Sequence, residues 1–534
     1  MQKTISLKLF PHEASDDVKI KEEISNVLQL KSGALTGFIV TKKSIDARGR
    51  QAWITISAQV FIDEPFMAKK PEVINFKDVH NSKNSVLIVG AGPAGLFAAL
   101  TFLEYGIKPI ILERGKDVRA RRRDLALLNK EGIINPESNY CFGEGGAGTY
   151  SDGKLYTRST KRGNTQRILN LFVQFGADEK ILYESHPHIG TNKLPQIITA
   201  MRKQIEGCGG EFLFNKKLVD ININANDIHS LTTADGDNFK ADAYVLATGH
   251  SARDIFILLD KKRILIEQKP FALGVRIEHP QVVIDSIQYH CDVRSQFLPP
   301  ASYSLVEQVS GKGVFSFCMC PGGIIAPAAT DNGELVVNGW SPSKRNNPFA
   351  NSGIVVQVEK SDLNNHMQQD KNKLMSNALL GMYFQQSVER KAYAAGGGNF
   401  VAPAQRMADF VNNKISSSLP ECSYLPGIAS VDLKVVLPGF IHKILQQGFK
   451  DFGKQKKGYF TNEAVIVATE SRTSSPVRIP RNEKTLQHPQ LTNFYPCGEG
   501  AGYAGGIVSA AMDGERIATA IAEKLKMNTS QLYK

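Results

Sequence analysis

Three features of this 534-residue sequence predict an α/β fold. A continuous apolar run at 86–89 is typical of a buried parallel strand, and a glycine-rich turn joins it to an apolar helical segment. The same order of strand, glycine-rich turn and helix returns from 494 to about 524. Between them, about 265 to 465 carries mixed strand and helix signals and is too long for a simple crossover. We therefore expect a Rossmann-type domain interrupted by a long inserted α+β substrate or cap domain.

The first 63 residues are predicted to form a separate small α+β module. Ile5, Leu7 and Leu9 alternate as in a strand, and a segment of helical spacing follows at 20–28. Further strand-like segments near 37–40 and 54–62 complete a β-α-β-β order. A polar stretch over 64–84 is typical of a linker. Such a module could bind a partner or serve as a structural cap.

The first glycine loop has the pattern of a dinucleotide-binding site. Gly90, Gly92 and Gly95 fit G-x-G-x-x-G between a strand and a helix. Gly90 permits a tight turn, Gly92 lets the backbone approach a pyrophosphate, and Gly95 allows the helix to pack on the strand. Glu113 ends the next strand, about 20 residues further on, where a carboxylate accepts hydrogen bonds from ribose hydroxyls.

A second glycine cluster distinguishes FAD from NAD. At 497–506 it supplies Glu499 after a strand and then the start of a helix at Ile507. A bound flavin extends across the sheet and needs a contact near its ribitol, which this acid can provide. The dipole of the following helix would stabilise negative charge on a reduced ring. We therefore predict FAD as the cofactor.

A third cluster, at 142–155, contains small residues that would lie close to the flavin and the pyrophosphate. It is not a P-loop, because Lys154 is followed by leucine. The turn at 247–249 is typical of the end of an FAD-binding domain. The residues expected to bind the cofactor are Gly90, Gly92, Pro93, Ala94, Gly95, Glu113, Arg114, Gly145, Gly146, Ala147, Gly148, Val219, Thr248, Gly249, Gly498, Glu499, Gly505, Gly506 and Ile507.

These signals predict an order of domains along the chain. The expected parts are an N-terminal α+β module at 1–63, a linker at 64–84, a first part of the FAD-binding domain at 85–265, an inserted substrate or cap domain at 266–465 and a C-terminal part of the FAD-binding domain at 466–534.

The composition is that of a globular enzyme, with 42% hydrophobic and 22% charged residues. No apolar run reaches the roughly 18–20 residues that a membrane helix requires. Without a signal-peptide pattern at the start, we expect a cytoplasmic protein with no membrane span. Seven scattered cysteines favour reduced thiols over disulfides, and they complete no metal-binding set.

The net charge of +12 is compatible with a nucleic-acid partner, an anionic cofactor or a basic surface. Dispersed lysines favour the basic surface, so a nucleic-acid partner stays open but is not favoured. The exception is the cluster of Arg119, Arg121, Arg122 and Arg123. On a helix these four cannot share one face, so we expect one to reach the phosphate side of FAD and the rest to be solvated.

Few side chains stand out as catalytic candidates. His250 follows the turn at 247–249 and could donate a proton, although a structural histidine is the alternative. Cys318 and Cys320 could form a redox pair or could be small buried residues. Arg472 and Arg478 offer donors to an anionic group, or form structural ion pairs. Since a second dinucleotide fingerprint is missing, NAD(P)H would bind only transiently.

The motifs GAGPAGLFAAL (90–100), FGEGGAGTYSDGKL (142–155), HIGTNKL (188–194), ATGHSARD (247–254), FCMCPGG (317–323), ESRTSSPVRI (470–479) and GEGAGYAGGI (498–507) occur in this order. Together they resemble a large bacterial family of uncharacterised FAD-dependent dehydrogenases of the glutathione-reductase-like Rossmann type. That family is more distantly similar to flavoproteins that include tRNA-modifying enzymes. The resemblance implies the fold and FAD. Tyr150 replaces the usual Phe, and Asn192 replaces the usual Asp and removes its charge.

Three functional hypotheses follow. The first is an FAD-dependent dehydrogenase or reductase that transfers hydride between flavin N5 and a small molecule held under the inserted domain. The second is a nucleic-acid-linked, tRNA-modifying-like flavoprotein that uses the basic surface and the N-terminal module. The third is a non-enzymatic flavin-binding sensor. The sequence specifies neither the small molecule nor an oligomeric state.

Overall fold

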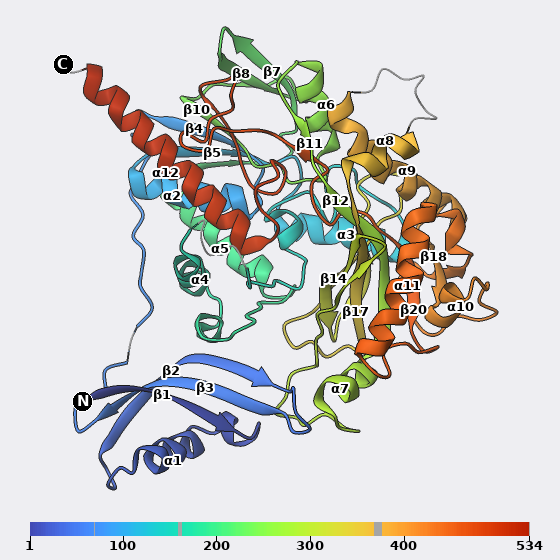
Figure 1. Ribbon diagram of the computed structural model, residues 1–534. Helices are drawn as coiled ribbons and strands as arrows, with labels where there is room; N and C mark the ends of the chain where they lie inside the picture. Colours follow the sequence, from blue (N-terminus) through green and yellow to red (C-terminus); the bar gives the residue numbers. More distant parts are fainter. Residues whose placement is uncertain (69, 158–162, 368–375, 533–534) are drawn as a thin grey trace.

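The computed structural model describes residues 1–534 except 69, 158–162, 368–375 and 533–534 (Figure 1). The chain begins with the N-terminal module, an antiparallel sheet of β1 (Gln2–Leu9), β2 (Leu35–Asp46) and β3 (Trp53–Ile62) in the order β1-β3-β2. Helix α1 (Asp17–Leu28) packs Ile20 and Ile24 against one face of this sheet. Asp16 caps the helix by accepting from the Val18 amide. The predicted β-α-β-β module is confirmed.

A five-stranded parallel sheet follows the linker, in the order β22-β10-β4-β5-β6. Its strands are β4 (Ser85–Val89), β5 (Lys108–Leu112), β6 (Glu211–Leu213), β10 (Ala243–Leu246) and β22 (Phe494–Pro496). The last strand comes from the far end of the chain, because the inserted part lies between β10 and β22. The predicted Rossmann-like α/β fold is therefore confirmed.

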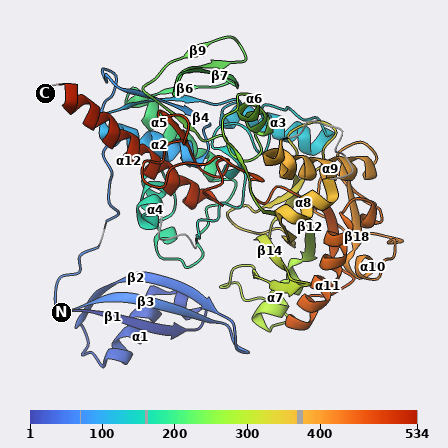
Figure 2. The same cartoon turned by 45° about the horizontal axis from the view of Figure 1, so that its top comes forward.

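Helices cover one face of the parallel sheet. They are α2 (Pro93–Tyr105), α5 (Leu194–Gly207) and α12 (Ile507–Leu532), and they share one apolar core with Val86 and Ile88. Helix α2 starts at a proline, which needs no amide partner there, and ends at Gly106 in the left-handed region. Figures 1 and 2 both show α12 lying across α2.

A second core lies on the other face of this sheet. It joins Leu87 and Leu112 to α6 (Arg253–Lys261) and to the small antiparallel sheet of β7 (Leu218–Asn224), β8 (Asp227–Thr233) and β9 (Asn238–Phe239). Helix α4 (Thr165–Gln174) packs in the first core, together with Val118 at the start of α3 (Val118–Glu131). The sheet is thus covered on both faces, as a parallel sheet requires.

The inserted part is built on a seven-stranded mixed sheet in the order β13-β14-β17-β12-β20-β18-β19. The strands are β12 (Phe271–Pro280), β13 (Val306–Val309), β14 (Lys312–Pro321), β17 (Phe349–Val358), β18 (Ala402–Arg406), β19 (Ile428–Ser430) and β20 (Val465–Glu470). Strand β20 pairs with β12. The sheet therefore extends past residue 465, where we expected the inserted domain to end, because β20 completes its centre.

Helix α11 (Gly439–Gln455) packs Ile441, Leu445 and Phe449 into the core of this sheet. The remaining elements are β11 (Glu267–Gln268), β15 (Ile324–Pro327), β16 (Val337–Trp340), β21 (Val477–Arg478), α7 (Gln281–Tyr289), α8 (Lys360–Met367), α9 (Leu380–Ala395) and α10 (Met407–Val411). Among the described residues, no helix combines the length and the apolar character needed to cross a membrane.

Candidate functional site

The first glycine loop lies at the carboxyl end of β4. Gly90 has a φ of +106°, and a Cβ there would lie 2.5 Å from the carbonyl oxygen of Ala247. A Cβ on Gly95 would clash with the Gly90 carbonyl oxygen, so α2 can lie this close to β4 only with glycine at 95. A Cβ on Gly92 would meet only the Gly146 Cα, at 3.9 Å, which leaves room beside the start of α2.

The third glycine cluster packs directly on the first. The Gly145 amide donates to the Ala91 carbonyl at 2.9 Å, and a Cβ on Gly146 would lie 3.1 Å from the Gly92 Cα. A Cβ on Gly148 would lie 3.3 Å from the Ile507 side chain. Two glycine segments and the start of α12 therefore meet at one place.

The second glycine cluster completes this arrangement. A Cβ on Gly498 would lie 2.9 Å from the Ala94 side chain, and one on Gly500 would lie 2.5 Å from the Gly249 carbonyl oxygen. By contrast, a Cβ on Gly249, Gly505 or Gly506 would have no described atom within 4 Å beyond its own chain neighbours. The segments at 90–95, 143–148, 247–249 and 498–507 thus form a backbone-lined cradle with an open rim.

Glu113 holds two segments of the cradle together through hydrogen bonds. Its buried carboxylate accepts from the amides of Ala91 at 2.9 Å, Gly115 at 2.8 Å and Gly143 at 3.0 Å. Hydrogen bonds to an ionised acceptor are the strong ones, so this side chain ties the first and third glycine segments together. Sequence reasoning placed Glu113 at the site for ribose binding and did not foresee these amide contacts.

Arg114 points toward other protein groups. Its guanidinium bonds Glu137 at 2.6 Å and Asp254 at 2.9 Å, and it lies 4.2 Å from the centre of the Phe142 ring. These contacts hold the strand end against the segment that leads into the third glycine cluster. The expected role of Arg114 in cofactor binding stays a prediction.

Arg121 is a structural residue that sequence reasoning did not single out from its cluster. It is fully buried and donates to the carbonyls of Asn139 at 2.8 Å, Tyr140 at 3.0 Å and Glu144 at 2.9 Å. Its guanidinium also lies 5.1 Å from the Tyr150 ring. Burial lowers the pKa of Arg121. This side chain thus shapes the third glycine cluster, whereas Arg119, Arg122 and Arg123 are exposed.

His250 lies between two protein groups. Its Nδ1 is 3.3 Å from a Glu499 carboxylate oxygen, and its Nε2 is 3.0 Å from the Arg472 carbonyl oxygen. Both ring nitrogens therefore have protein partners. The arrangement orients Glu499 at the rim of the second glycine cluster.

Two cations lie next to this rim. Lys269 and Arg478 both lie against Gly502, since a Cβ there would come within 3.5 Å of atoms of each. Burial and the neighbouring Arg478 lower the pKa of Lys269, although Glu499 acts in the opposite direction. Arg478 also lies 4.8 Å from the Tyr503 ring. Two basic residues and the acid Glu499 thus lie around Gly502.

Cys318 and Cys320 lie on β14 at a bulge. The pairing with β17 shifts between Phe317 and Cys320, and Cys318 has a φ of +44°. The Arg276 guanidinium holds the Cys318 carbonyl at 2.7 Å, and the Lys154 ammonium donates to the Met319 carbonyl. The Cys318 side chain is exposed, yet surrounding protein desolvates it and raises the pKa of its thiol to about 12. Both thiols are free.

Arg276 itself is held by the sheet. It is fully buried and bonds Glu470 at 2.8 Å and the Asn351 amide oxygen at 2.8 Å. Among the described atoms, the Asn351 Nδ2 is buried and has no hydrogen-bond partner. A buried donor without a partner carries an energetic cost, which makes this an unusual position in the sheet.

Arg472 belongs to a buried ion-pair network. It bonds Glu334 at 2.9 Å and Glu389 at 2.9 Å, and Arg253 bonds the same two acids at 3.1 and 2.7 Å. Burial alone would raise the pKa of Glu389, but the two guanidiniums outweigh it and lower this pKa. Arg472 is thus a structural ion-pair residue, the alternative that its sequence context left open.

The other predicted site residues are placed as follows. A Cβ on Gly90 would lie 3.1 Å from the Thr248 Cα, so Thr248 is part of the cradle. Val219 is exposed on β7 and stays a prediction. Across the described residues, no group of three or more His, Cys, Asp or Glu side chains is arranged to hold a metal ion.

Comparisons with known proteins match most of the chain. The model of the family described as FAD-dependent protein, C-terminal domain-like, matches residues 270–473, and that of pyridine nucleotide-disulphide oxidoreductases matches 84–257. A domain of unknown function matches residues 1–61. An uncharacterized protein of Clostridium beijerinckii is 39% identical over 531 residues, covering 96% of this chain and 97% of that protein.

Two solved structures are also similar to this chain. The 2,6-dihydroxypyridine-3-hydroxylase of Arthrobacter nicotinovorans aligns at 10% identity and a TM-score of 0.37, over 83% of this chain and 84% of that one. The glycine oxidase of Bacillus cereus aligns at 12% identity and a TM-score of 0.30, over 83% of this chain and 96% of that one.

Proposed function

The chain belongs to the family of FAD-dependent proteins with a pyridine nucleotide-disulphide oxidoreductase domain, and from this premise we propose that it is an FAD-dependent dehydrogenase or reductase of a small molecule. One observation carries the proposal. Four segments far apart in the sequence, at 90–95, 143–148, 247–249 and 498–507, meet through backbone contacts that a Cβ would obstruct. Such a cradle fits an extended dinucleotide, because backbone amides can approach its phosphates closely.

Each part of the cradle has a proposed role toward the cofactor. The start of α2, with Gly92, Pro93 and Ala94, would face the pyrophosphate. Glu113 would serve the ribose, directly or through the two loops it holds. Glu499, oriented by His250, would contact the ribitol. When bound, FAD supplies hydride transfer at N5 of its ring.

The start of α12 supports an oxidoreductase role. Its free amide groups carry positive partial charge beside Gly505 and Gly506, where there is open space, and Lys269 and Arg478 contact the neighbouring Gly502. Positive charge there would favour binding of a group that gains negative charge on reduction. The 3.3 Å contact with Glu499 and the hydrogen bond to the Arg472 carbonyl make His250 a positioning residue in this proposal.

We assign Cys318 and Cys320 to the wall of the substrate region rather than to redox chemistry. A thiol reacts with a disulfide as the thiolate, and a pKa of about 12 keeps the Cys318 thiol protonated at neutral pH. The exposed Cys318 and the Lys154 ammonium are the polar groups that this part of the sheet offers to a substrate.

The proposal is tested with the purified full-length protein. Its visible spectrum and the FAD released on denaturation give the occupancy, and apoprotein is titrated with FAD by quenching of flavin fluorescence. The loaded protein is then mixed anaerobically with NADH and, separately, with NADPH. We expect stoichiometric FAD and bleaching of the flavin by at least one of the two nucleotides.

Two outcomes would contradict the proposal. A colourless protein that also binds no added FAD would remove the cofactor assignment. A protein that holds FAD but is reduced by neither nucleotide, nor by any substrate in a panel of amines, alcohols and hydroxy acids under anaerobic conditions, would point to flavin binding without catalysis.

A further inference from the structure

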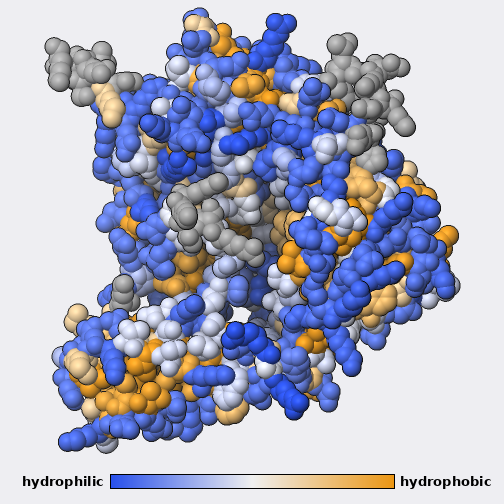
Figure 3. Space-filling model, viewed as in Figure 1, coloured by the Kyte–Doolittle hydropathy of each residue, from blue (hydrophilic) through white to orange (hydrophobic). Residues whose placement is uncertain are grey.

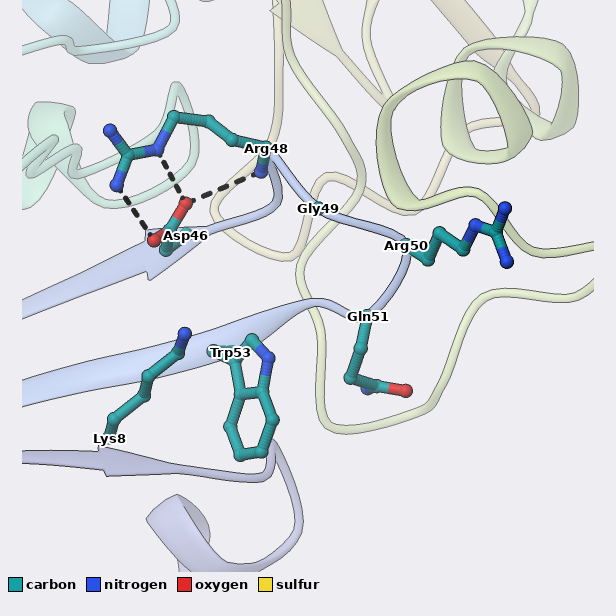
Figure 4. Close-up of a pocket in the computed structure, with 7 residues that line it drawn as sticks. All are labelled: Lys8, Asp46, Arg48, Gly49, Arg50, Gln51 and Trp53. Carbon is teal, nitrogen blue, oxygen red and sulfur yellow. Dashed lines mark hydrogen bonds and ion pairs between the residues drawn. The ribbon is translucent and has the colours of Figure 1, made fainter.

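The N-terminal module carries a depression of about 610 Å³ that lies apart from the cofactor cradle. It is lined by Lys8, Asp46, Arg48, Gly49, Arg50, Gln51 and Trp53 (Figure 4). These residues come from the end of β1, the end of β2, the β2–β3 hairpin and the start of β3. Figure 4 shows Lys8 beside the Trp53 ring and Arg50 extending away from the hairpin.

The aromatic part of this site is a short stack of rings. Phe10 stacks on Trp53 with their ring centres 4.4 Å apart and an angle of 27°, and His12 stacks on Phe10 at 5.8 Å and 16°. The Lys8 ammonium lies 4.9 Å from the centre of the Trp53 ring. Phe10 is 38% exposed, so part of the stack is accessible from solvent.

The open face of the sheet continues the site away from Trp53. Strand pairing places Lys8 opposite Thr55 and Ser6 opposite Ser57, and these side chains point to the face that α1 does not cover. On the other side, Lys42 lies opposite Ser57. All five side chains are exposed or half-buried. The face therefore offers hydroxyl groups and cations in rows beside the aromatic stack.

Charge is unevenly distributed over this module. Residues 1–61 contain nine Lys and Arg and six Asp and Glu, and five of these six acids lie between Glu13 and Glu23, at and around α1. The strands and the hairpin retain one acid, Asp46, which bonds Arg48 at 2.8 Å. Arg50 has no hydrogen-bond or ion-pair partner among the residues that the structure describes. The open face is thus positively charged.

We propose that this face binds single-stranded nucleic acid, with one base stacked at Trp53 and Phe10 and the backbone phosphates at Lys8, Arg50 and Lys42. Stacking platforms combined with a basic path are the features by which proteins hold unpaired strands. An extended nucleic-acid strand fits better than one free nucleotide, because the cations and hydroxyls continue beyond the depression along β1, β3 and β2. Each further nucleotide then adds contacts that a single one cannot make.

A nucleic acid bound to this face would lie next to the rest of the protein. Helix α1 lies on the side of the sheet away from the larger part of the molecule. The open face is therefore turned toward that larger part (Figure 1). Strand β2 fixes this orientation, since the Lys43 amide donates to the Tyr183 carbonyl at 2.8 Å and the Ser185 amide donates to the Lys43 carbonyl at 2.9 Å. Figure 3 shows openings between the module and the part above it.

The test uses the full-length, FAD-loaded protein and a fluorescein-labelled single-stranded RNA of about 12 nucleotides. Fluorescence anisotropy gives the affinity between about 50 and 200 mM salt. We expect saturable binding that weakens with salt. Arg50→Ala should lower the affinity about tenfold and reduce the salt slope by about one. Trp53→Ala should lower the affinity about tenfold, and Trp53→Phe should restore most of it.

A control variant on the opposite side of the module tests whether binding depends on the open face. Lys21→Ala removes an exposed lysine from α1, on the other side of the module, and should leave the affinity unchanged. The FAD content should be equal in all variants. Absence of saturable binding, equal losses in Lys21→Ala and Arg50→Ala, or displacement of the strand by free AMP as readily as by unlabelled strand would each overturn the proposal.

Discussion

At the scale of single residues, Glu113 connects the cofactor cradle to the sheet. Its carboxylate accepts from three backbone amides, two of them in the first and third glycine segments. Glu113→Ala leaves these amides without their acceptor in a buried place, and it also removes the group proposed to serve the ribose. We expect FAD occupancy to fall markedly in the purified variant, measured as the ratio of flavin absorbance to protein absorbance.

Glu211→Ala provides the control for Glu113→Ala. Glu211 lies on β6 of the same sheet and bonds Lys108 at the surface, at 2.6 Å. The Glu211→Ala variant should retain the FAD occupancy of the unmodified protein. Full occupancy in Glu113→Ala would remove Glu113 from the cofactor site.

A second residue, Glu278, makes stability depend on pH. Burial raises its pKa to about 7 from 4.5, although Ser423 donates to both carboxylate oxygens. The folded protein therefore keeps a proton that the unfolded chain releases in this range. The contribution to stability is complete below pH 4.5 and is lost as the pH rises toward about 7.

Glu278→Gln should remove this dependence. The difference in unfolding free energy between the variant and the unmodified protein should change by on the order of 3 kcal/mol between the two ends of that range. Urea unfolding at a series of pH values measures it, with the exposed Glu463→Gln as control. A difference that does not vary with pH would show that Glu278 is not protonated in the folded protein.

At the scale of elements, the cradle depends on how closely α2 and α12 approach their neighbours. A Cβ on Gly95 would clash with the Gly90 carbonyl oxygen and lie 3.2 Å from the Ile88 side chain. A Cβ on Gly514 would clash with the Ala94 carbonyl oxygen, where α12 crosses α2. Small residues at these crossings set the position of both helix starts, which border the proposed FAD site.

Gly95→Ala should therefore separate α2 from β4. We expect a loss of about 1–3 kcal/mol in unfolding free energy, as in overpacked cores, together with lower FAD occupancy. Gly207→Ala is the matched control, because a Cβ there has no atom within 4 Å and its backbone is in the helix α5. Thermal unfolding and flavin absorbance report both effects. Equal stability of the two variants would contradict this account of the helix packing.

In strand β14, a β-bulge determines where two backbone carbonyls point. The bulge at Cys318 turns two consecutive carbonyls toward Arg276 and Lys154. The Cys-x-Cys pattern was visible in the sequence, whereas the bulge was not. It depends on pairing with β17, which is distant along the chain.

At the scale of the whole molecule, a buried network joins the FAD-binding part to the inserted part. Arg253 is the first residue of α6, which packs on one face of the parallel sheet, and Glu389 lies on α9 of the inserted part. Glu389 accepts from Arg253 at 2.7 Å, Arg472 at 2.9 Å and Ser471 at 2.7 Å. This network fixes the inserted sheet beside the cradle.

Glu389→Gln would leave the buried Arg472 and the partly buried Arg253 with Glu334 as their shared carboxylate. Since breaking a buried ion pair from one side is strongly destabilising, we expect a loss of about 3–5 kcal/mol. Urea unfolding measures it, and Glu22→Gln, in the exposed pair with Lys19, should show no measurable change. An equally small effect in Glu389→Gln would mean that other contacts hold the two parts together.

Much of this architecture could be predicted from local sequence patterns. The parallel strands, the helices that start at Pro93 and Ile507, and the β-α-β-β module all carry periodic apolar residues and short connections. The sheet of the inserted part continues past the predicted boundary at 465. Strand β20 belongs to the inserted sheet only because it pairs with β12, almost 200 residues away in the sequence.

Local sequence patterns were enough to identify the segments that form the glycine cradle, because turns, close approach and helix starts require glycine, proline and an acid at particular spacings. The roles of the charged side chains depend instead on the tertiary structure. Arg121 shapes a glycine loop, Arg472 is neutralised by buried acids, and Arg50 extends toward solvent. The partners of a long charged side chain come from elements distant in sequence, and burial determines whether such a partner is needed.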